Sequence, residues 1–256
     1  MKGILSRANR EVLEQFACSN VLLAFDFDGT LAPIVADRER AAMRSTTRAR
    51  LAELSRLYPI VVISGRGQAD VHRRLNGTGV RDVVGNHGIE PWKATARLKE
   101  DVRRWLPVLH ERLSSLRGVK IEDKGFSVAI HYRQSREKKR AQAAIHEAAL
   151  ELGDIRVIGG KQVVNFLPLG APHKGLALER ERRGHGCDTA IYVGDDETDE
   201  DVFGLEQPGR LLAIRVGAKR SSQAAYFIRS QNEIDELLRV LVAMRPAARI
   251  RTRARP

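Results

Sequence analysis

"LLAFDFDGTLAPIV", from Leu22 to Val35, places two aspartates directly behind an apolar stretch. The apolar residues 21–25 are typical of a buried strand, and Asp26 and Asp28 follow with only Phe27 between them. Like charges this close repel, and burying either one is costly unless it is paired or bound to a metal. The stretch therefore indicates a cation at the end of a buried strand, and a chemical reason for needing one.

Short apolar strands alternate with helical stretches on the C-terminal side of this motif. This alternation is typical of a parallel sheet covered by helices. The 256 residues are enough for one large domain or two small ones. We expect strands within residues 21–27, 59–67, 81–88, 189–196 and 210–217, and helices within residues 39–58, 67–75, 199–205 and 231–244.

The middle of the chain has a different pattern, in which two helices alternate with two hairpins. Helices are expected at 98–118 and 136–152, and Pro107 should bend the first helix or mark its start. The hairpins should turn at Lys124–Gly125 and at Gly159–Gly160. We therefore predict an α+β module, residues 97–167, inserted into a parallel α/β core formed by residues 1–96 and 168–256.

The composition, 43% hydrophobic and 30% charged, is that of an ordinary soluble globular protein. No apolar run approaches the ~20 residues that span a bilayer, and the first residues lack the apolar core of a signal peptide. The two cysteines have no metal-ligand spacing and are expected to be reduced thiols. These features predict a cytoplasmic protein without a membrane partner.

The net charge of +12 raises the alternative of a nucleic-acid partner. The basic residues are spread along the chain except in "RPAARIRTRARP", at about residues 245–256, where five arginines occur without an acid. We predict a solvated basic tail rather than a nucleic-acid arm. The positive field would also attract an anionic substrate.

Polar groups follow four of the predicted core strands. They are Asp26 and Asp28, Ser64 in "VVISGR", the "GNHG" of residues 85–88, and the "GDDETDED" of residues 194–201. Ligands of open parallel sheets bind beyond the carboxyl ends of the strands, so neighbouring strands would gather these acids in one crevice. Carboxylates with water are the ligands that Mg2+ prefers.

This set of groups fits phosphoryl transfer. One aspartate attacks phosphorus and a second carboxylate moves the proton of the leaving group and of the attacking water. A metal, a lysine, a hydroxyl and backbone N–H groups cover the phosphoryl oxygens. Lys174, in "PHKG" at an expected helix start, supplies the lysine.

"DFDGTLAPI", "VISGR", "HKG" and "YVGDDETDED" resemble, in order, the four motifs of the haloacid dehalogenase superfamily. The insert lies between the second and third motifs, where it resembles the type-2 cap of that superfamily. More narrowly, "GNHGIE", "KGFSVAIHYR" and "GDDETDED" together resemble the trehalose-6-phosphate phosphatase family. The resemblance implies a HAD-like Rossmannoid core with a cap, an Mg2+ cofactor, and hydrolysis of trehalose 6-phosphate to trehalose and phosphate in trehalose biosynthesis. We expect a monomer that binds a small sugar phosphate.

The resemblance also implies roles for residues. Asp26 would be the nucleophile and Asp28 the general acid and base, while Ser64 and Lys174 would bind the phosphoryl group. Mg2+ would be held by the Asp26 carboxylate, the Asp28 backbone carbonyl and Asp195. Asp199 would orient a water or Lys174, and Thr30, Arg66 and Asp196 would support the site. The residues implied to bind the substrate are Asn86, His87, Lys124, His131, Arg133, Lys161 and Asn165.

Simpler interpretations stay open for several of these residues. His131 and Arg133 alternate along a strand and share one face, which would also suit a solvated sheet. Lys124 has a similar alternative in a hairpin turn, and His87 would also serve as a loop cap. Trp92 and Trp105 are expected to pack.

One departure from the family pattern concerns the sugar. The family has a glutamate where "KQVVNFLP" places Asn165. An amide still hydrogen-bonds a hydroxyl, but it carries no charge and has a different donor pattern. The first rival hypothesis is therefore a phosphatase of the same mechanism that acts on another phosphorylated disaccharide or glycoside. A non-catalytic sugar-phosphate sensor and a nucleic-acid binder are the others.

Overall fold

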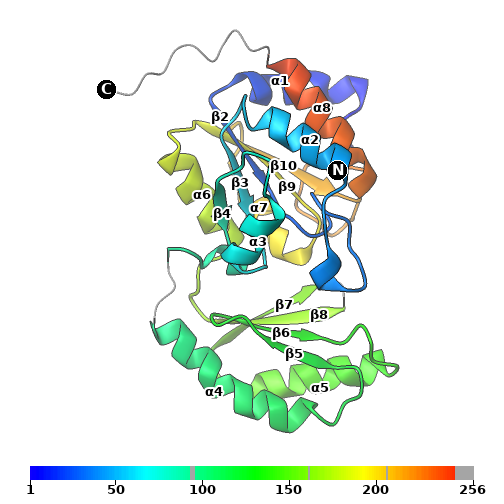
Figure 1. The fold of residues 1–256 in the computed structure, drawn as a ribbon, viewed down its shortest axis with the longest axis vertical. Helices are drawn as coiled ribbons and strands as arrows, with labels where there is room; N and C mark the ends of the chain where they lie inside the picture. Colours follow the sequence, from blue (N-terminus) through cyan, green and yellow to red (C-terminus); the bar gives the residue numbers. More distant parts are fainter. Residues whose placement is uncertain (93–95, 161, 206, 246–256) are drawn as a thin grey trace.

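Seven parallel strands form the larger of two sheets in the computed structural model, which describes residues 1–92, 96–160, 162–205 and 207–245 (Figure 1). Their order is β1-β11-β10-β9-β2-β3-β4, and every neighbouring pair is parallel. The predicted parallel core is confirmed, although β1 and β11, two short strands at one edge, were not expected. The bounds are β1 (Lys2–Gly3), β2 (Val21–Phe25), β3 (Ile60–Ile63), β4 (Asp82–Val84), β9 (Thr189–Gly194), β10 (Leu211–Val216) and β11 (Tyr226–Ile228).

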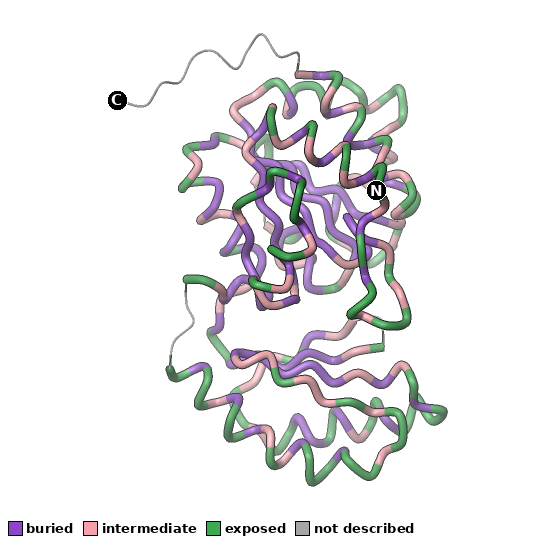
Figure 2. Tube along the Cα trace, in the orientation of Figure 1, coloured by how far each residue is buried: buried purple, intermediate pink, exposed green. Residues whose placement is uncertain are grey.

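Helices cover both faces of this sheet, so the central strands β2 and β3 are buried throughout (Figure 2). In β2, Val21, Leu23 and Phe25 pack with one set of helices, and Leu22 and Ala24 pack with the other. The first set is α1 (Arg10–Cys18), α2 (Ser45–Leu54), α3 (Gln68–Arg74) and α8 (Ile234–Met244); the second is α6 (Lys174–Gly184) and α7 (Glu200–Phe203). Short 3-10 helices are η1 (Arg7–Asn9), η2 (Arg38–Arg40), η3 (Asn86–Gly88), η4 (Glu197–Asp199) and η5 (Gln231–Glu233).

A second, antiparallel sheet has the order β5-β6-β8-β7. Its helices, α4 and α5, lie on the face that points away from the parallel sheet, and they share an apolar core with β6 and β8 (Figure 1). The other face is therefore turned toward the carboxyl ends of the core strands. The bounds are α4 (Ala96–Leu113), β5 (Lys120–Asp123), β6 (Val128–His131), α5 (Lys138–Glu151), β7 (Ile155–Gly160) and β8 (Val163–Pro168).

Two local predictions were wrong, and one of the two alternatives for Pro107 is excluded. The helix expected at 39–58 begins only at Ser45, because the preceding residues form a loop and the short η2 instead. Pro107 does not start α4, which begins at Ala96. Gly159–Gly160 is not a turn, since β7 continues to Gly160, which pairs with Val163.

The two glycines of β7 leave space for neighbouring side chains instead of forming a turn. A Cβ at Gly159 would lie 3.0 Å from Glu197 Oε2, and a Cβ at Gly160 would lie 3.0 Å from Asp196 Oδ2 and 2.8 Å from Val163 Cγ1. The side-chain-free stretch lets β7 approach the loop after β9 closely. The glycines therefore allow β7 of the antiparallel sheet to contact the loop that follows β9 of the parallel sheet.

Within the described ranges, no helix combines the length and apolar character needed to cross a membrane. The basic tail predicted at about residues 245–256 lies outside those ranges from residue 246 onward.

Candidate active site

Three neighbouring strands carry predicted site residues at their carboxyl ends. Asp26 follows β2, Ser64 follows β3 and Asp195 follows β9, and the order β9-β2-β3 makes these strand ends adjacent. All three side chains are buried. The acids that the sequence placed at separate strand ends thus meet in one place, as expected for an open parallel sheet.

Lys174, the first residue of α6, lies between two of the acids. Its Nζ is 2.8 Å from Asp26 Oδ1 and 2.7 Å from Asp199 Oδ1. Burial alone would lower the pKa of the Lys174 ammonium, but the carboxylates of Asp199 and Asp26 raise it above its ordinary value. Lys174 is therefore a fixed positive charge at the floor of the site.

Asp199 holds this part of the site in place. Besides Lys174, its Oδ1 accepts a hydrogen bond from the Tyr192 hydroxyl at 2.6 Å. Its Oδ2 accepts from the backbone N–H groups of Asp195 and Asp196, both at 2.8 Å. Since both oxygens are occupied by these donors, Asp199 can orient Lys174 and the Asp195 loop.

The acids at the floor of the site need more positive charge than Lys174 supplies. Carboxylate oxygens of Asp26, Asp195 and Asp199 all lie within 4.8 Å of one another. Burial raises the pKa of Asp26 well above its ordinary value; Lys174 lowers it, but the other two carboxylates raise it further. A divalent cation beside Asp26 and Asp195 would keep both ionised, and oxygen ligands of this kind fit Mg2+.

Gly29 shows how closely the loop after β2 packs against Asp195. Its φ is +90°, and a Cβ on it would lie 2.2 Å from Asp195 Oδ2. Only glycine combines this backbone conformation with this approach. The glycine of "DGT" in the opening motif therefore has a packing role.

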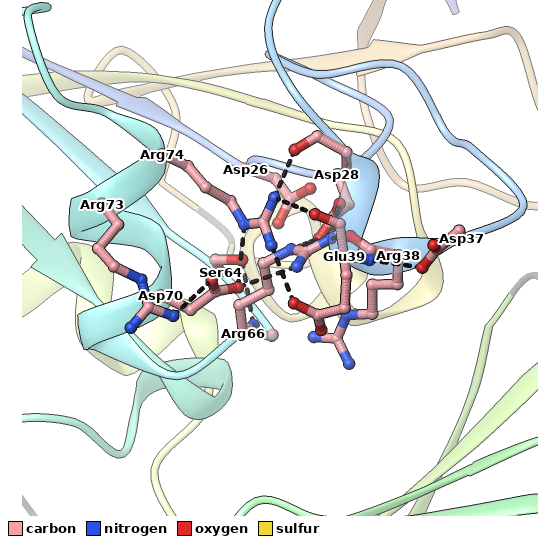
Figure 3. A network of polar contacts seen from close by, with 12 residues as sticks. Asp26, Asp28, Asp37, Arg38, Glu39, Ser64, Arg66, Asp70, Arg73 and Arg74 are labelled. Carbon is pink, nitrogen blue, oxygen red and sulfur yellow. Dashed lines mark hydrogen bonds and ion pairs between the residues drawn. The ribbon is translucent and has the colours of Figure 1, made fainter.

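Asp28 occupies a different environment from Asp26, because its side chain is 34% exposed and is held by Arg66 (Figure 3). Arg66 Nε lies 2.6 Å from Asp28 Oδ2, and Arg66 Nη2 lies 2.8 Å from Asp28 Oδ1. The guanidinium is buried and also donates to Asp70 Oδ2 at 2.9 Å and to the Arg38 carbonyl at 2.7 Å. This two-point contact fixes the plane of the Asp28 carboxylate.

A cavity of about 580 Å3 lies between the floor of the site and the open face of the second sheet. Predicted site residues line this cavity on both sides. Five of them belong to the core, four belong to the second sheet's region, and His87 lies in the lining as well. These are Asp26, Asp28, Lys174, Asp195 and Asp196 on one side, and Lys124, His131, Arg133 and Asn165 on the other.

Other predicted residues lie behind this lining. Ser64 is buried, and its Oγ accepts a hydrogen bond from the Arg66 backbone N–H at 3.2 Å. Thr30, Arg66, Asn86 and Asp199 are buried outside the lining as well. Lys161 lies outside the described residues.

The side chains of the second sheet's region also contact the core. Lys124 Nζ donates to the Gly65 carbonyl at 2.8 Å, and Asn86 Nδ2 donates to the Lys124 carbonyl at 3.2 Å. Arg133 Nη1 donates to the Val35 carbonyl at 2.8 Å. Burial, reinforced by the positive charge of Arg38, lowers the pKa of Lys124 to about 7.

Glu122 and Arg38 are cavity residues that the sequence interpretation missed. Glu122 Oε2 lies 2.7 Å from His131 Nε2 and 2.5 Å from Arg38 Nη1, so it joins the second sheet to the loop before α2. Burial would raise the pKa of Glu122, but the His131 hydrogen bond and nearby cations lower it to about 2. A signal existed: Lys120, Glu122 and Lys124 alternate, and alternate residues of a strand share a face.

The family profile and the related sequences that match this chain all point to the same family. The profile of the trehalose-phosphatase family matches residues 24–232. Trehalose-phosphate phosphatase of Mycolicibacterium paratuberculosis is 34% identical over 207 residues, which cover 75% of this chain and 53% of that protein. Probable trehalose-phosphate phosphatase G of Arabidopsis thaliana is 28% identical, over 87% of this chain and 68% of that protein. The chain thus spans about half the length of the mycobacterial relative.

Among solved structures, the C-terminal domain of a trehalose-6-phosphate phosphatase from C. albicans has a similar fold. The two superpose with a TM-score of 0.76 at 23% identity, covering 93% of this chain and 98% of that chain. At this identity the likeness concerns the fold, which is that of the HAD-like phosphatases with an additional antiparallel sheet.

Proposed function

The chain belongs to the trehalose-phosphatase family, and we propose that it is an Mg2+-dependent phosphatase that hydrolyses trehalose 6-phosphate to trehalose and phosphate. One observation carries the proposal. Asp26 and Lys174, with Asp199 behind them, form the buried floor of a cavity whose opposite wall bears cationic and hydrogen-bonding side chains of the second sheet's region. Such a cavity suits a substrate with a phosphoryl group at one end and hydroxyls at the other.

The reaction would proceed in two displacements. In the first, an Asp26 carboxylate oxygen attacks phosphorus, the bond from phosphorus to the sugar oxygen breaks, and Asp28 donates a proton to that oxygen. In the second, Asp28 takes a proton from water, the water oxygen attacks the phosphorus of the aspartyl phosphate, and phosphate leaves with Asp26 restored. The separate environments of the two aspartates support this division of roles.

The phosphoryl group would be held by charge and by hydrogen bonds. Lys174 and the Ser64 hydroxyl would bind its oxygens, while Asp199 keeps Lys174 in position. Mg2+ would be held by the carboxylates of Asp26 and Asp195 and by the Asp28 backbone carbonyl. When bound, it would offset the repulsion between Asp26 and the anionic phosphoryl group.

The region that bears the second sheet, residues 97–167, would act as a cap that selects the sugar. Lys124, His131, Arg133 and Asn165 line the cavity on that side, and Asn86 would support this set through Lys124. Asn165 is buried and neutral, which favours a second candidate: the same reaction on another phosphorylated disaccharide or glycoside. The protein would act as a cytoplasmic monomer.

The test is phosphate release in the presence of Mg2+ from a panel of sugar phosphates, with Asp26→Asn as the control. Trehalose 6-phosphate should give the highest kcat/KM, and the variant should lose at least about 1000-fold in kcat, because no other nucleophile replaces Asp26. A different glycosyl phosphate at the top of the panel would retain the mechanism and replace the substrate. Absence of turnover, with wild type and variant alike, would refute the enzyme and favour a sugar-phosphate sensor.

A further inference from the structure

Arg215 is a buried arginine near the carboxyl end of β10, and none of the sequence motifs includes it. The residue is 5% exposed, and in the sheet it pairs with Gly194, which directly precedes Asp195. The other residues of β10 are apolar, so this charge stands out in the strand. Burying a guanidinium is costly unless its charge and its N–H groups find partners. The partners of Arg215 therefore indicate why an arginine is present here.

Two of these partners are backbone carbonyls of the loop after β9. Arg215 Nη2 donates to the Asp195 carbonyl at 2.6 Å, and Nη1 donates to the Asp196 carbonyl at 3.3 Å. A guanidinium is planar and its donors have a fixed geometry. By binding two successive carbonyls, Arg215 therefore fixes the peptide units that carry them.

Glu200, the first residue of α7, balances the charge of Arg215. Its Oε1 accepts a hydrogen bond from Arg215 Nη1 at 2.8 Å, and its Oε2 accepts from the Gln223 backbone N–H at 2.9 Å. The guanidinium is thus anchored to α7 and, through Glu200, to the segment after β10. Since one carboxylate balances one guanidinium, Arg215 acts on the loop through its position and its hydrogen bonds more than through net charge.

The same loop is held from another direction by Asp199. Asp199 Oδ2 accepts from the backbone N–H groups of Asp195 and Asp196, whereas Arg215 binds the carbonyls of these two residues. A Cβ at Gly194 would lie 2.3 Å from Asp199 Cγ, so Asp199 packs directly against the backbone that leads into the loop. A buried acid and a buried base therefore hold the donors and the acceptors of the same short segment.

This segment carries a proposed metal ligand. The Asp195 carboxylate lies within 4.8 Å of those of Asp26 and Asp199, and a Cβ at Gly29 would lie 2.2 Å from its Oδ2. Mg2+ demands near-ideal octahedral geometry, so its ligands must be held closely in place. Groups that orient a ligand from behind contribute to metal affinity for this reason. Arg215 is one of the two side chains that hold the backbone of Asp195.

We propose that Arg215 is a positioning residue for Mg2+ binding, because it fixes the backbone of Asp195 and Asp196 and so places the Asp195 carboxylate beside Asp26. This inference rests on the proposed function, which assigns Mg2+ to these two carboxylates. It accounts for a buried charge at the end of an otherwise apolar core strand. It also gives Glu200 a role, which is to hold the guanidinium against the loop.

Two variants of Arg215 test the proposal. Arg215→Met keeps a long side chain and removes every donor. Arg215→Lys keeps a cation for Glu200, but an ammonium cannot hold both carbonyls in one plane. Thermal unfolding of each variant reports whether the fold is retained. If Arg215→Met does not fold, Arg215→Lys decides the test.

Arg182, in α6, provides a matched control for the loss of a buried arginine. It is 8% exposed and pairs with Glu179 at 2.9 Å. It also donates to two backbone carbonyls, those of Cys187 at 2.9 Å and Asp188 at 3.3 Å. These carbonyls lie at the amino end of β9, whereas the metal site lies at its carboxyl end. Arg182→Lys therefore removes the same kind of contact away from the site.

The first readout is Mg2+ binding to the substrate-free protein, measured by isothermal titration calorimetry. The Kd for Mg2+ should rise about 10-fold in Arg215→Lys and up to about 100-fold in Arg215→Met, and it should stay within about 2-fold of wild type in Arg182→Lys. The two lysine variants should lose similar amounts of Tm. Equal Kd values for Mg2+ in Arg215→Lys and Arg182→Lys would show that Arg215 supports only the fold, and would overturn the proposal.

The second readout is phosphate release from para-nitrophenyl phosphate, which has no sugar, as the Mg2+ concentration is varied. In Arg215→Lys the half-maximal Mg2+ concentration should rise about 10-fold, while kcat at saturating Mg2+ should recover to within about 3-fold of wild type. A loss of kcat that Mg2+ does not restore would contradict a role in metal binding. A wild-type protein that does not bind Mg2+ would refute the proposed function, whereas normal Mg2+ binding in both Arg215 variants would refute this inference alone.

Discussion

Arg66 grips both carboxylate oxygens of Asp28, with Nε 2.6 Å from Oδ2 and Nη2 2.8 Å from Oδ1 (Figure 3). The same guanidinium donates to Asp70 and to the Arg38 carbonyl, so one buried cation connects the proposed acid and base to α3 and to the loop before α2. Arg38 in turn contacts Glu122 on the second sheet. The position of Asp28 is thus connected, through two arginines, to the region proposed to close over the substrate.

Replacing Arg66 by lysine tests this positioning. A lysine keeps a positive charge but cannot contact both Asp28 oxygens in a fixed plane. We expect Arg66→Lys to lower kcat about 10- to 100-fold while KM changes less than about 3-fold, because Asp28 moves the proton and the substrate contacts lie elsewhere. Arg73→Lys is the control, since Arg73 is exposed and pairs with the same Asp70. Equal effects of the two substitutions on kcat would show that Arg66 does not position Asp28.

Asp199 should contribute strongly to stability. Its carboxylate accepts from Lys174, the Tyr192 hydroxyl and two backbone N–H groups, and all of these donors except the Asp196 N–H are at buried positions. In Asp199→Asn, the amide NH2 must face some of these donors, which leaves Lys174 with one carboxylate partner. We expect a loss of about 3 kcal/mol in the free energy of unfolding, measured by urea denaturation. Asp154→Asn, at an exposed position, is the control; a similar small change in both variants would contradict this assignment.

The pH dependence of activity should report Lys124. Its pKa is lowered to about 7, so the ammonium is charged below that pH and becomes neutral above it. Because the proposed substrate is anionic, kcat/KM should fall about 10-fold as the pH rises from about 6 to about 8. Lys124→Arg should remove this fall, since arginine stays protonated throughout the range. Lys139→Arg, at an exposed position of α5, should retain it. An unchanged profile in Lys124→Arg would exclude Lys124 as the titrating group.

Magnesium should stabilise the fold as well as support activity. At a concentration ten times its Kd, Mg2+ should add about 1.4 kcal/mol to the free energy of unfolding, which corresponds to a rise of about 3–5 °C in Tm. Asp195→Asn should abolish this rise, because Asp195 is a proposed ligand, whereas the exposed Asp188→Asn should retain it. A chelator should stop phosphate release, and added Mg2+ should restore it. If Mg2+ does not change the Tm of the wild-type protein, the proposed Mg2+ site is contradicted.

The parallel core could be predicted because its sequence signals are local. In β2, five consecutive apolar residues are buried on both faces, and two acids mark the strand's end. Neighbouring strands then bring Asp26, Ser64 and Asp195 together by topology alone. The short edge strand β1 could not be recognised in the same way, because it has two residues and its pairing partner β11 lies more than two hundred residues along the chain.

The rest of the site depends on contacts between distant segments. Arg38 and Glu122 are separated by 84 positions, and neither residue has a local pattern that names the other. Gly159 and Gly160 of β7 look like a turn in the sequence. In the structure they allow the strand to lie close to Glu197 and Asp196. Tertiary packing thus decided these features: the alternation of Lys120, Glu122 and Lys124 indicates a shared strand face, but it does not indicate the partner Arg38.

We expect that substitution of Asn165 changes the preference of the protein among sugar phosphates. It is 5% exposed, lines the cavity and stands in β8 where the family resemblance would place a glutamate. A carboxylate accepts stronger hydrogen bonds from hydroxyls than an amide does, so Asn165→Glu should raise kcat/KM for trehalose 6-phosphate about 5- to 10-fold. It should leave para-nitrophenyl phosphate unchanged, because that substrate has no hydroxyls. The buried charge should also lower the free energy of unfolding of the substrate-free protein by about 1–3 kcal/mol. Asn165→Gln, which extends the side chain without charge, separates the effect of length from that of charge. If Asn165→Glu weakens turnover of trehalose 6-phosphate while another glycosyl phosphate leads the wild-type panel, the neutral amide is matched to that other sugar.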